Sequence, residues 1–163
     1  MNKLVKPNCD LGKDYFAIGM YSPKNPENLG ILIRTAKQMG AAYVFTIGEK
    51  YKKNQILVNK IDQKIPIFFF KNWKDFKESI SDNIKIIGIE LTDKSKNLST
   101  FEHPKNCIYL LGSEDYGIND EKILNSLDGC VIIEGNKSMN VAVSGSIVLY
   151  DRYIKLVHNK KLN

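Results

Sequence analysis

Short apolar runs alternate along the chain with segments in which apolar residues recur every three or four positions. Compact apolar runs bounded by polar residues are typical of strands that are buried on both faces. Six such runs predict strands at residues 15–21 (YFAIGMY), 43–47 (YVFTI), 65–70 (IPIFFF), 84–91 (IKIIGIEL), 107–112 (CIYLLG) and 129–134 (GCVIIE). Because doubly buried strands occur chiefly in parallel arrangements, the pattern predicts a mostly parallel sheet.

The segments between these runs have helical periodicity and recognisable helix ends. We expect helices at residues 26–40, 71–80 and 119–127, and a last one from about Asn140 to His158. Asn25 is the expected N-cap of the first helix, with Pro26 at its first position, and Asn119 the expected cap of the third. Strands and helices in alternation predict an α/β fold, a mostly parallel sheet flanked by helices, in one domain over residues 1–163 with its core at about 15–155.

Composition narrows the class of protein only slightly. Twenty-four Lys and Arg against eighteen Asp and Glu give a net charge of +6. This excess indicates a polyanionic partner if it gathers on one face, and otherwise describes an ordinary Lys-rich soluble protein. The sequence has no N-terminal signal and no apolar run long enough to cross a membrane, so we expect a cytoplasmic protein without a membrane partner.

Three cysteines, Cys9, Cys107 and Cys130, form no CxxC pair. Cys107 and Cys130 lie inside apolar runs, where a free cysteine packs as a small hydrophobic residue. This arrangement indicates a reducing compartment and no structural zinc.

Polar and glycine residues collect after three of the predicted strands, where ligands of parallel sheets usually bind. The three loops are NPENLGILIRT with Asn28, Gly30 and Arg34, LLGSEDYGIND with Gly112, Glu114 and Gly117, and EGNKSMN with Ser138 and Asn140. Taken singly, each has a plainer explanation. The glycines suit turns, Arg34 suits a solvated helix face, and Ser138 suits a helix cap.

The sequence lacks the motifs of several common binding and catalytic sites. LGSEDYG lacks the Lys-Ser or Lys-Thr pair of a P-loop, no GxGxxG follows the first strand, and the two histidines, His103 and His158, are far apart. No metal site is therefore predicted. A cofactor held mainly by backbone groups of glycine-bearing loops, beside a polar cluster, fits better.

Three segments resemble, in order, the motifs of the SpoU/TrmH-type RNA 2′-O-ribose methyltransferases of the SPOUT superfamily. They are NLGILIRTAKQMGA, LLGSEDYG and SMNVAVSGSIVLYDRY, and the resemblance covers about residues 15–155. It implies S-adenosylmethionine as cofactor, transfer or ribosomal RNA as substrate, and a C-terminal trefoil knot that holds the cofactor. It also implies a homodimer, for which the small-residue face of the last helix, with Ala142, Ser146 and the spacing to Tyr150, is the expected contact.

The resemblance also implies roles for individual residues. The catalytic set is Arg34, Asn28, Glu114, Ser138 and Asn140, and the cofactor-binding set is Glu90, Leu111, Gly112, Val131, Ile132, Ser138 and Met139. Methyl transfer to a ribose 2′-hydroxyl is an in-line displacement that requires alignment of oxygen, carbon and sulfur. Arginine keeps its proton to strongly alkaline pH. We therefore expect Arg34 to clamp a phosphate or the 2′-oxygen, with Asn28 and Glu114 fixing its geometry.

The segment EKYKKNQ, residues 49–55, is the candidate RNA-binding loop. Its Lys50, Lys52 and Lys53 suit phosphate contact and its Tyr51 suits base stacking, with Arg34 as a further RNA contact. A solvated loop is the plainer reading of the same residues. A module that binds the cofactor or RNA without turnover is the alternative to an enzyme.

Overall fold

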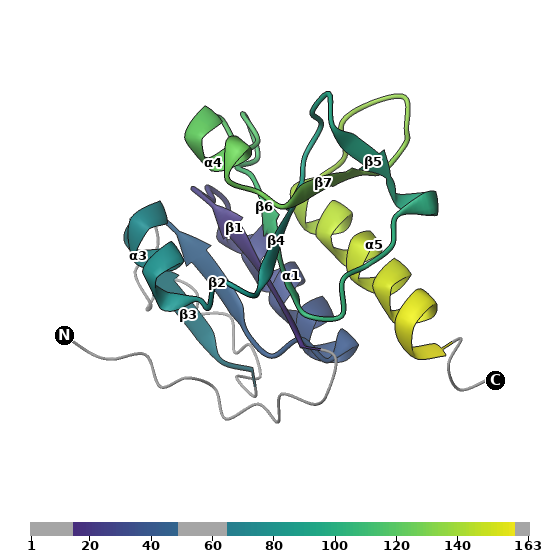
Figure 1. The fold of residues 1–163 in the computed structure, drawn as a ribbon, viewed down its shortest axis with the longest axis horizontal. Helices are drawn as coiled ribbons and strands as arrows, with labels where there is room; N and C mark the ends of the chain where they lie inside the picture. The colour runs from purple at the N-terminus through teal and green to yellow at the C-terminus, as the bar shows by residue number, and fades with distance from the viewer. Residues whose placement is uncertain (1–14, 49–64, 159–163) are drawn as a thin grey trace.

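The computed structural model describes residues 15–48 and 65–158. These residues form a seven-stranded sheet in the order β3-β2-β1-β6-β4-β7-β5, and every pair of neighbouring strands is parallel (Figure 1). The strands are β1 Phe16–Tyr21, β2 Val44–Ile47, β3 Ile67–Phe70, β4 Lys85–Ile89, β5 Ser95–Asn97, β6 Cys107–Leu111 and β7 Gly129–Ile132. The helices are α1 Pro26–Met39, α3 Trp73–Ser79, α4 Glu121–Asn125, α5 Val141–Tyr153, a 3-10 turn Leu98–Thr100 and a π-helical turn Ile154–His158.

The predicted parallel sheet is confirmed, and the structure adds one strand to the six expected. β5 has the polar sequence SKN and pairs only with β7 at the edge of the sheet. Its three side chains are exposed or half-buried, so the strand carries no run of apolar residues. The hydrophobic pattern therefore could not reveal it.

The helix ends agree with the sequence in part. Asn25 caps α1 as expected, with its Oδ1 accepting from the Glu27 N–H at 2.8 Å. The expected cap Asn119 is wrong, because α4 begins at Glu121 and the carboxylate of Asp120 accepts from the Lys122 N–H at 2.9 Å. In the described part of the chain, no helix is long and apolar enough to cross a membrane.

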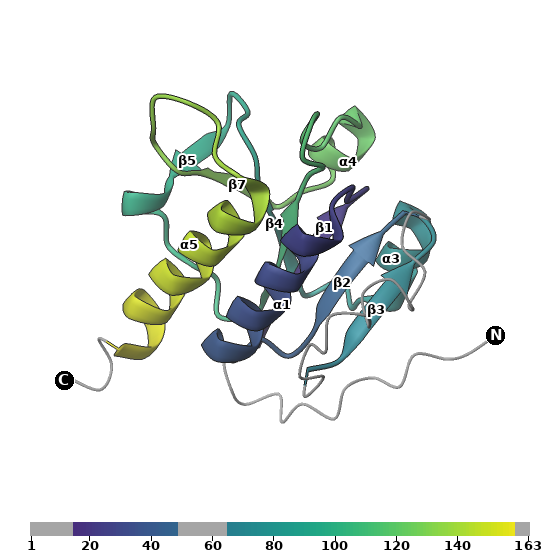
Figure 2. The same ribbon diagram turned by 180° about the vertical axis from the view of Figure 1, so that it is seen from behind.

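The two faces of the sheet have separate cores. Phe16, Ile18 and Met20 of β1 belong to the core shared with α1 and α5. Ala17, on the opposite face of the same strand, belongs to the core that includes Phe76 of α3. Figure 2 shows α1 and α5 side by side over the first face.

α1 and α5 pack closely because α5 carries small residues where they meet. A Cβ atom on Gly145 would lie 2.7 Å from Leu32 Cδ1 and 2.8 Å from Leu111 Cδ1. Ser146 Oγ lies 2.9 Å from Thr35 Oγ1, and Ala142 is fully buried. Ala142 is therefore covered within the chain's own fold, whereas Ser146 is only half-buried, and the expected dimer contact stays a prediction.

A buried polar cluster fixes the other end of α5. The Arg152 guanidinium donates to Pro104 O at 2.6 Å and to Lys105 O at 2.7 Å. His103 lies between Tyr109 Oη at 2.6 Å and Asp151 Oδ2 at 2.8 Å, and its burial lowers its pKa. These bonds tie the last turn of α5 to the segment before β6.

Candidate functional site

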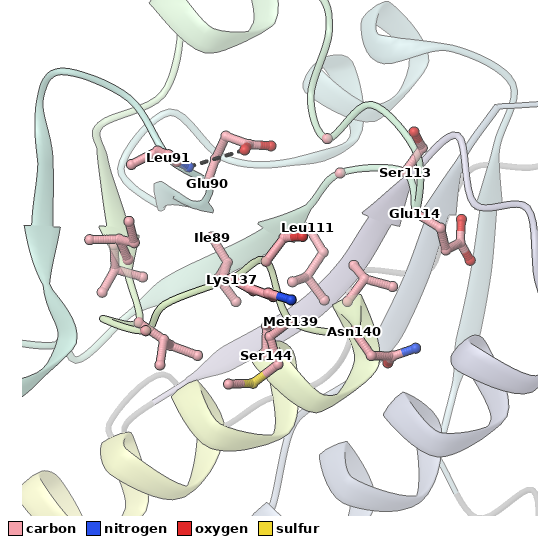
Figure 3. A pocket seen from close by; sticks show the side chains of 18 of the residues that line it. Ile89, Glu90, Leu91, Leu111, Ser113, Glu114, Lys137, Met139, Asn140 and Ser144 are labelled. Carbon is pink, nitrogen blue, oxygen red and sulfur yellow. Dashed lines mark hydrogen bonds between the residues drawn. The ribbon is translucent and has the colours of Figure 1, made fainter.

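A cavity of about 600 Å³ lies at the carboxyl ends of β6, β4 and β7, which are neighbours in the sheet. Crevices at strand ends where the chain order of an α/β sheet reverses are the usual ligand sites of such folds. Its wall comes from the residues after each of these strands and from the start of α5 (Figure 3). The cavity is therefore lined by two of the three expected loops, those after β6 and β7, while the loop after β1 does not line it.

One side of the cavity wall is apolar and another is polar. Ile89, Leu111 and Val131, at the ends of the three strands, form part of the apolar side. The carboxylate of Glu90 accepts from the Leu91 N–H at 3.0 Å and from the Ile118 N–H at 2.7 Å. Glu90 thereby holds the loop after β6 against the end of β4.

The loop after β6 requires glycine at two positions. Ser113 and Gly117 exchange two backbone hydrogen bonds of 3.0 Å each. A Cβ atom on Gly112 would lie 2.1 Å from the carbonyl carbon of Gly117, and Gly117 itself has φ +61°. An L side chain rarely adopts that φ, and nothing larger than hydrogen fits at position 112.

A chain of hydrogen bonds joins the three loops beside the cavity. Asn28 Nδ2 donates to Glu114 Oε1 at 3.1 Å, and Asn28 Oδ1 accepts from Asn140 Nδ2 at 3.0 Å. Asn140 is also the N-cap of α5, since its Oδ1 accepts from the Ala142 N–H at 2.9 Å. Asn28 is 5% exposed, whereas Asn140 is an exposed residue, so these contacts are partly buried.

Glu114 is the acceptor at the centre of this arrangement. The backbone N–H groups of Lys24 and Asn25 donate to it at 2.8 Å and 3.0 Å, in addition to the Asn28 amide. Burial acts to raise the pKa of Glu114, but these hydrogen bonds outweigh burial and hold the pKa below its ordinary value. The carboxylate is therefore ionised at neutral pH and fixes the entry to α1.

Most of the expected site residues gather here. Each of the seven expected cofactor residues lines the cavity: Glu90, Leu111, Gly112, Val131, Ile132, Ser138 and Met139. Glu114 and Asn140 line it as well, and Asn28 lies behind them. The plainer reading of Ser138 as a helix cap is wrong, because Asn140 caps α5.

Arg34 departs from the expected arrangement. It is exposed on α1 and forms no hydrogen bond or ion pair with the described residues, and it does not line the cavity. Asn28 lies six residues earlier in the helix, about 9 Å along its axis. The expected support of the guanidinium by Asn28 and Glu114 is therefore wrong, because these two side chains bind each other.

The other expected RNA contacts, Lys50, Tyr51, Lys52 and Lys53, lie outside the described residues. Sequence reasoning also left Lys137 out of the site. Lys137 lines the cavity, and its ammonium group extends into it (Figure 3). It belongs to the loop EGNKSMN, so its place in a polar loop after a buried strand was the signal that could have found it.

Comparison with known proteins gives a consistent family. The model of the SpoU rRNA Methylase family matches residues 15–150. The tRNA (guanosine(18)-2′-O)-methyltransferase TARBP1 of Mus musculus is 30% identical over an alignment of 138 residues that covers 77% of this chain and 8% of the mouse protein. The tRNA (guanosine(18)-2′-O)-methyltransferase of Aquifex aeolicus is 24% identical over an alignment of 144 residues that covers 78% of this chain and 64% of that protein.

Solved structures share the fold. The AdoMet-bound rRNA methyltransferase of Sinorhizobium meliloti superimposes with a TM-score of 0.77 at 21% identity, covering 89% of this chain and 58% of that one. This chain therefore spans less than two thirds of the length of each of these three proteins.

Proposed function

Because the chain belongs to the SpoU rRNA Methylase family, we propose that it transfers a methyl group from S-adenosylmethionine to a ribose 2′-hydroxyl of transfer or ribosomal RNA. The observation that supports this proposal most is the pair of side-chain hydrogen bonds that join Glu114 to Asn28 and Asn28 to Asn140. It unites the three motif loops at the edge of a cavity of cofactor size. Two relatives carry names of 2′-O-methyltransferases acting on tRNA.

The residues around the cavity suit this cofactor. Its volume of about 600 Å³ lies within the range of ~300–1,000 Å³ common for small-molecule sites. An apolar wall suits an adenine ring, and the carboxylates of Glu90 and Glu114 suit a ligand that carries a cationic sulfonium and an amino group. The residues that would hold it are Glu90, Leu111, Gly112, Val131, Ile132, Ser138 and Met139.

When bound, the cofactor supplies an electrophilic methyl group on its sulfonium. The protein's own task is then to orient the ribose and to exclude water from the reacting atoms. Glu114 and Asn140 fix the loops on either side of the cavity. Arg34 is exposed and has no partner among the residues described, so its guanidinium is available for an RNA phosphate or the 2′-oxygen. Ser138 and Asn140 lie at the cavity and complete the catalytic set.

RNA binding extends beyond Arg34 in this proposal. Lys50, Lys52 and Lys53 would contact phosphates, and Tyr51 would stack on a base. Replacing the three lysines together with alanine would then flatten the salt dependence of RNA binding, and an unchanged dependence would remove this loop from the interface.

Methyl transfer to RNA is measurable directly. The purified chain is incubated with tritium-labelled S-adenosylmethionine and total RNA from a strain that lacks its gene. We expect label in the RNA fraction that rises with time and saturates. Cofactor binding by calorimetry without any label in RNA would instead identify a silent binding module.

The proposal includes a homodimer. Ile31 of α1 and Val143 and Tyr150 of α5 are 42%, 41% and 55% exposed on two adjoining helices. Exposed apolar side chains on two helices that pack together suit a self-associating face. Sedimentation at micromolar concentration should give twice the mass of the chain, and a fully active monomer would contradict the dimer.

The trefoil knot stays a prediction that an experimental trace of residues 107–153 tests.

A further inference from the structure

The turn after β6 carries an exposed aromatic ring that the chemistry above does not use. Tyr116 lies between Asp115 and Gly117, which both line the cavity, and it is itself 69% exposed. A single exposed aromatic residue is ordinary on a protein surface. The contacts around Tyr116 show whether its ring is held in a fixed position beside the cavity.

The backbone below Tyr116 is held at several points. Ser113 and Gly117 on either side of the turn exchange two backbone hydrogen bonds, and the Tyr116 N–H donates to Ser113 Oγ at 3.3 Å. Gly112 is packed directly against Gly117. The ring therefore projects from a turn with little freedom to move.

Lys24 covers one face of the ring. Its Nζ lies 4.7 Å from the centre of the Tyr116 ring and is paired with the Asp115 carboxylate. The Lys24 backbone N–H donates to Glu114 Oε2 at 2.8 Å. The contacts that position Glu114 and Asn28 thus also position this ring, and the face opposite Lys24 is left for a flat partner.

We propose that Tyr116 is a stacking platform for an unpaired nucleobase of the RNA, next to the nucleotide whose ribose enters the cavity. The inference rests on the proposed function, because it supplies the substrate. Only a base outside a duplex offers its whole face to an aromatic side chain, so the platform favours a loop or single-stranded target. The Lys24 ammonium group on the other face of the ring is already paired with Asp115, so it adds little attraction for an RNA phosphate.

Three variants of the full chain test this role. Tyr116→Phe keeps the ring, Tyr116→Leu keeps apolar bulk without a ring, and Tyr116→Ala removes both. The probe is labelled small RNA from a strain lacking the gene, and its binding is measured at low and at physiological salt. We expect Tyr116→Ala and Tyr116→Leu to bind roughly 5- to 150-fold more weakly at both salt concentrations, and Tyr116→Phe to bind like the parent.

Calorimetry with S-adenosylmethionine supplies the matched readout. The cofactor affinity of all three variants should equal that of the parent, because Tyr116 does not line the cavity. Equal RNA binding by the alanine variant and the parent would overturn the platform, and so would full binding by the leucine variant. A parent that binds RNA with this ring dependence but transfers no methyl group would overturn the proposed function alone. A parent that binds no RNA would overturn both.

Discussion

Replacing Gly112 with alanine is expected to reduce affinity for S-adenosylmethionine by at least about 100-fold, equivalent to ~2.7 kcal/mol. The added Cβ would lie 2.1 Å from the Gly117 carbonyl carbon and 2.4 Å from Ile118 N. Both contacts are with backbone, which cannot rotate away as a side chain can. The backbone at Gly117 and Ile118 must therefore shift, which disturbs the cavity wall and the hydrogen bond from the Ile118 N–H to Glu90. Calorimetry with the purified variant measures the loss.

Gly135 provides the matched control. It also lines the cavity, but a Cβ there would meet only Lys137 O, at 3.8 Å, an ordinary contact distance. Gly135→Ala should bind the cofactor within about 3-fold of the parent, or ~0.7 kcal/mol. If Gly112→Ala binds as well as Gly135→Ala, the cofactor does not occupy this cavity.

Replacing Arg34 with alanine is expected to lower the rate of methyl transfer by about 100- to 1,000-fold, the usual effect of removing one group that acts at the reacting oxygen. Cofactor affinity should stay unchanged, because Arg34 does not line the cavity. The fold should be equally stable, since the side chain is exposed and has no bonds to the described residues. Single-turnover rates with saturating RNA separate this effect from weaker RNA binding.

Lys37→Ala removes the same charge one turn further along α1 and should transfer methyl groups at nearly the parent rate. Arg34→Lys should recover little activity, because an ammonium group lacks the planar fork of the guanidinium. Turnover near the parent value in Arg34→Ala would remove this residue from the catalytic set.

The sequence predicted the sheet well because its strands are apolar on both faces. It also predicted that the loops after β1, β6 and β7 lie together, because parallel strands place their carboxyl ends at one edge. The sequence did not predict which side chains contact each other within those loops. Asn28 and Arg34 belong to one motif, which suggested that they act in one cluster. In the structure they lie apart along α1, and Asn28 forms hydrogen bonds with Glu114 and Asn140 instead.

Two further features depend on the folded backbone alone. In the folded chain a Cβ atom on Gly112 would clash with the backbone of Gly117, five residues further along. Whether Asn119 or Asp120 caps α4 depends on the path of the preceding loop, since both side chains can accept from a helix N-terminus. Neither close approach nor loop path is encoded in a local pattern.

Nucleoside mass spectrometry tests the central claim most directly. RNA from a strain lacking the gene is treated with the purified chain and S-adenosylmethionine, digested to nucleosides and compared with untreated RNA. We predict the gain of a 2′-O-methylated nucleoside whose added methyl group fragments with the ribose, and no gain with the Arg34→Ala variant. A methyl group that fragments with the base, or no methylated nucleoside at all, would contradict ribose 2′-O-methylation by this chain.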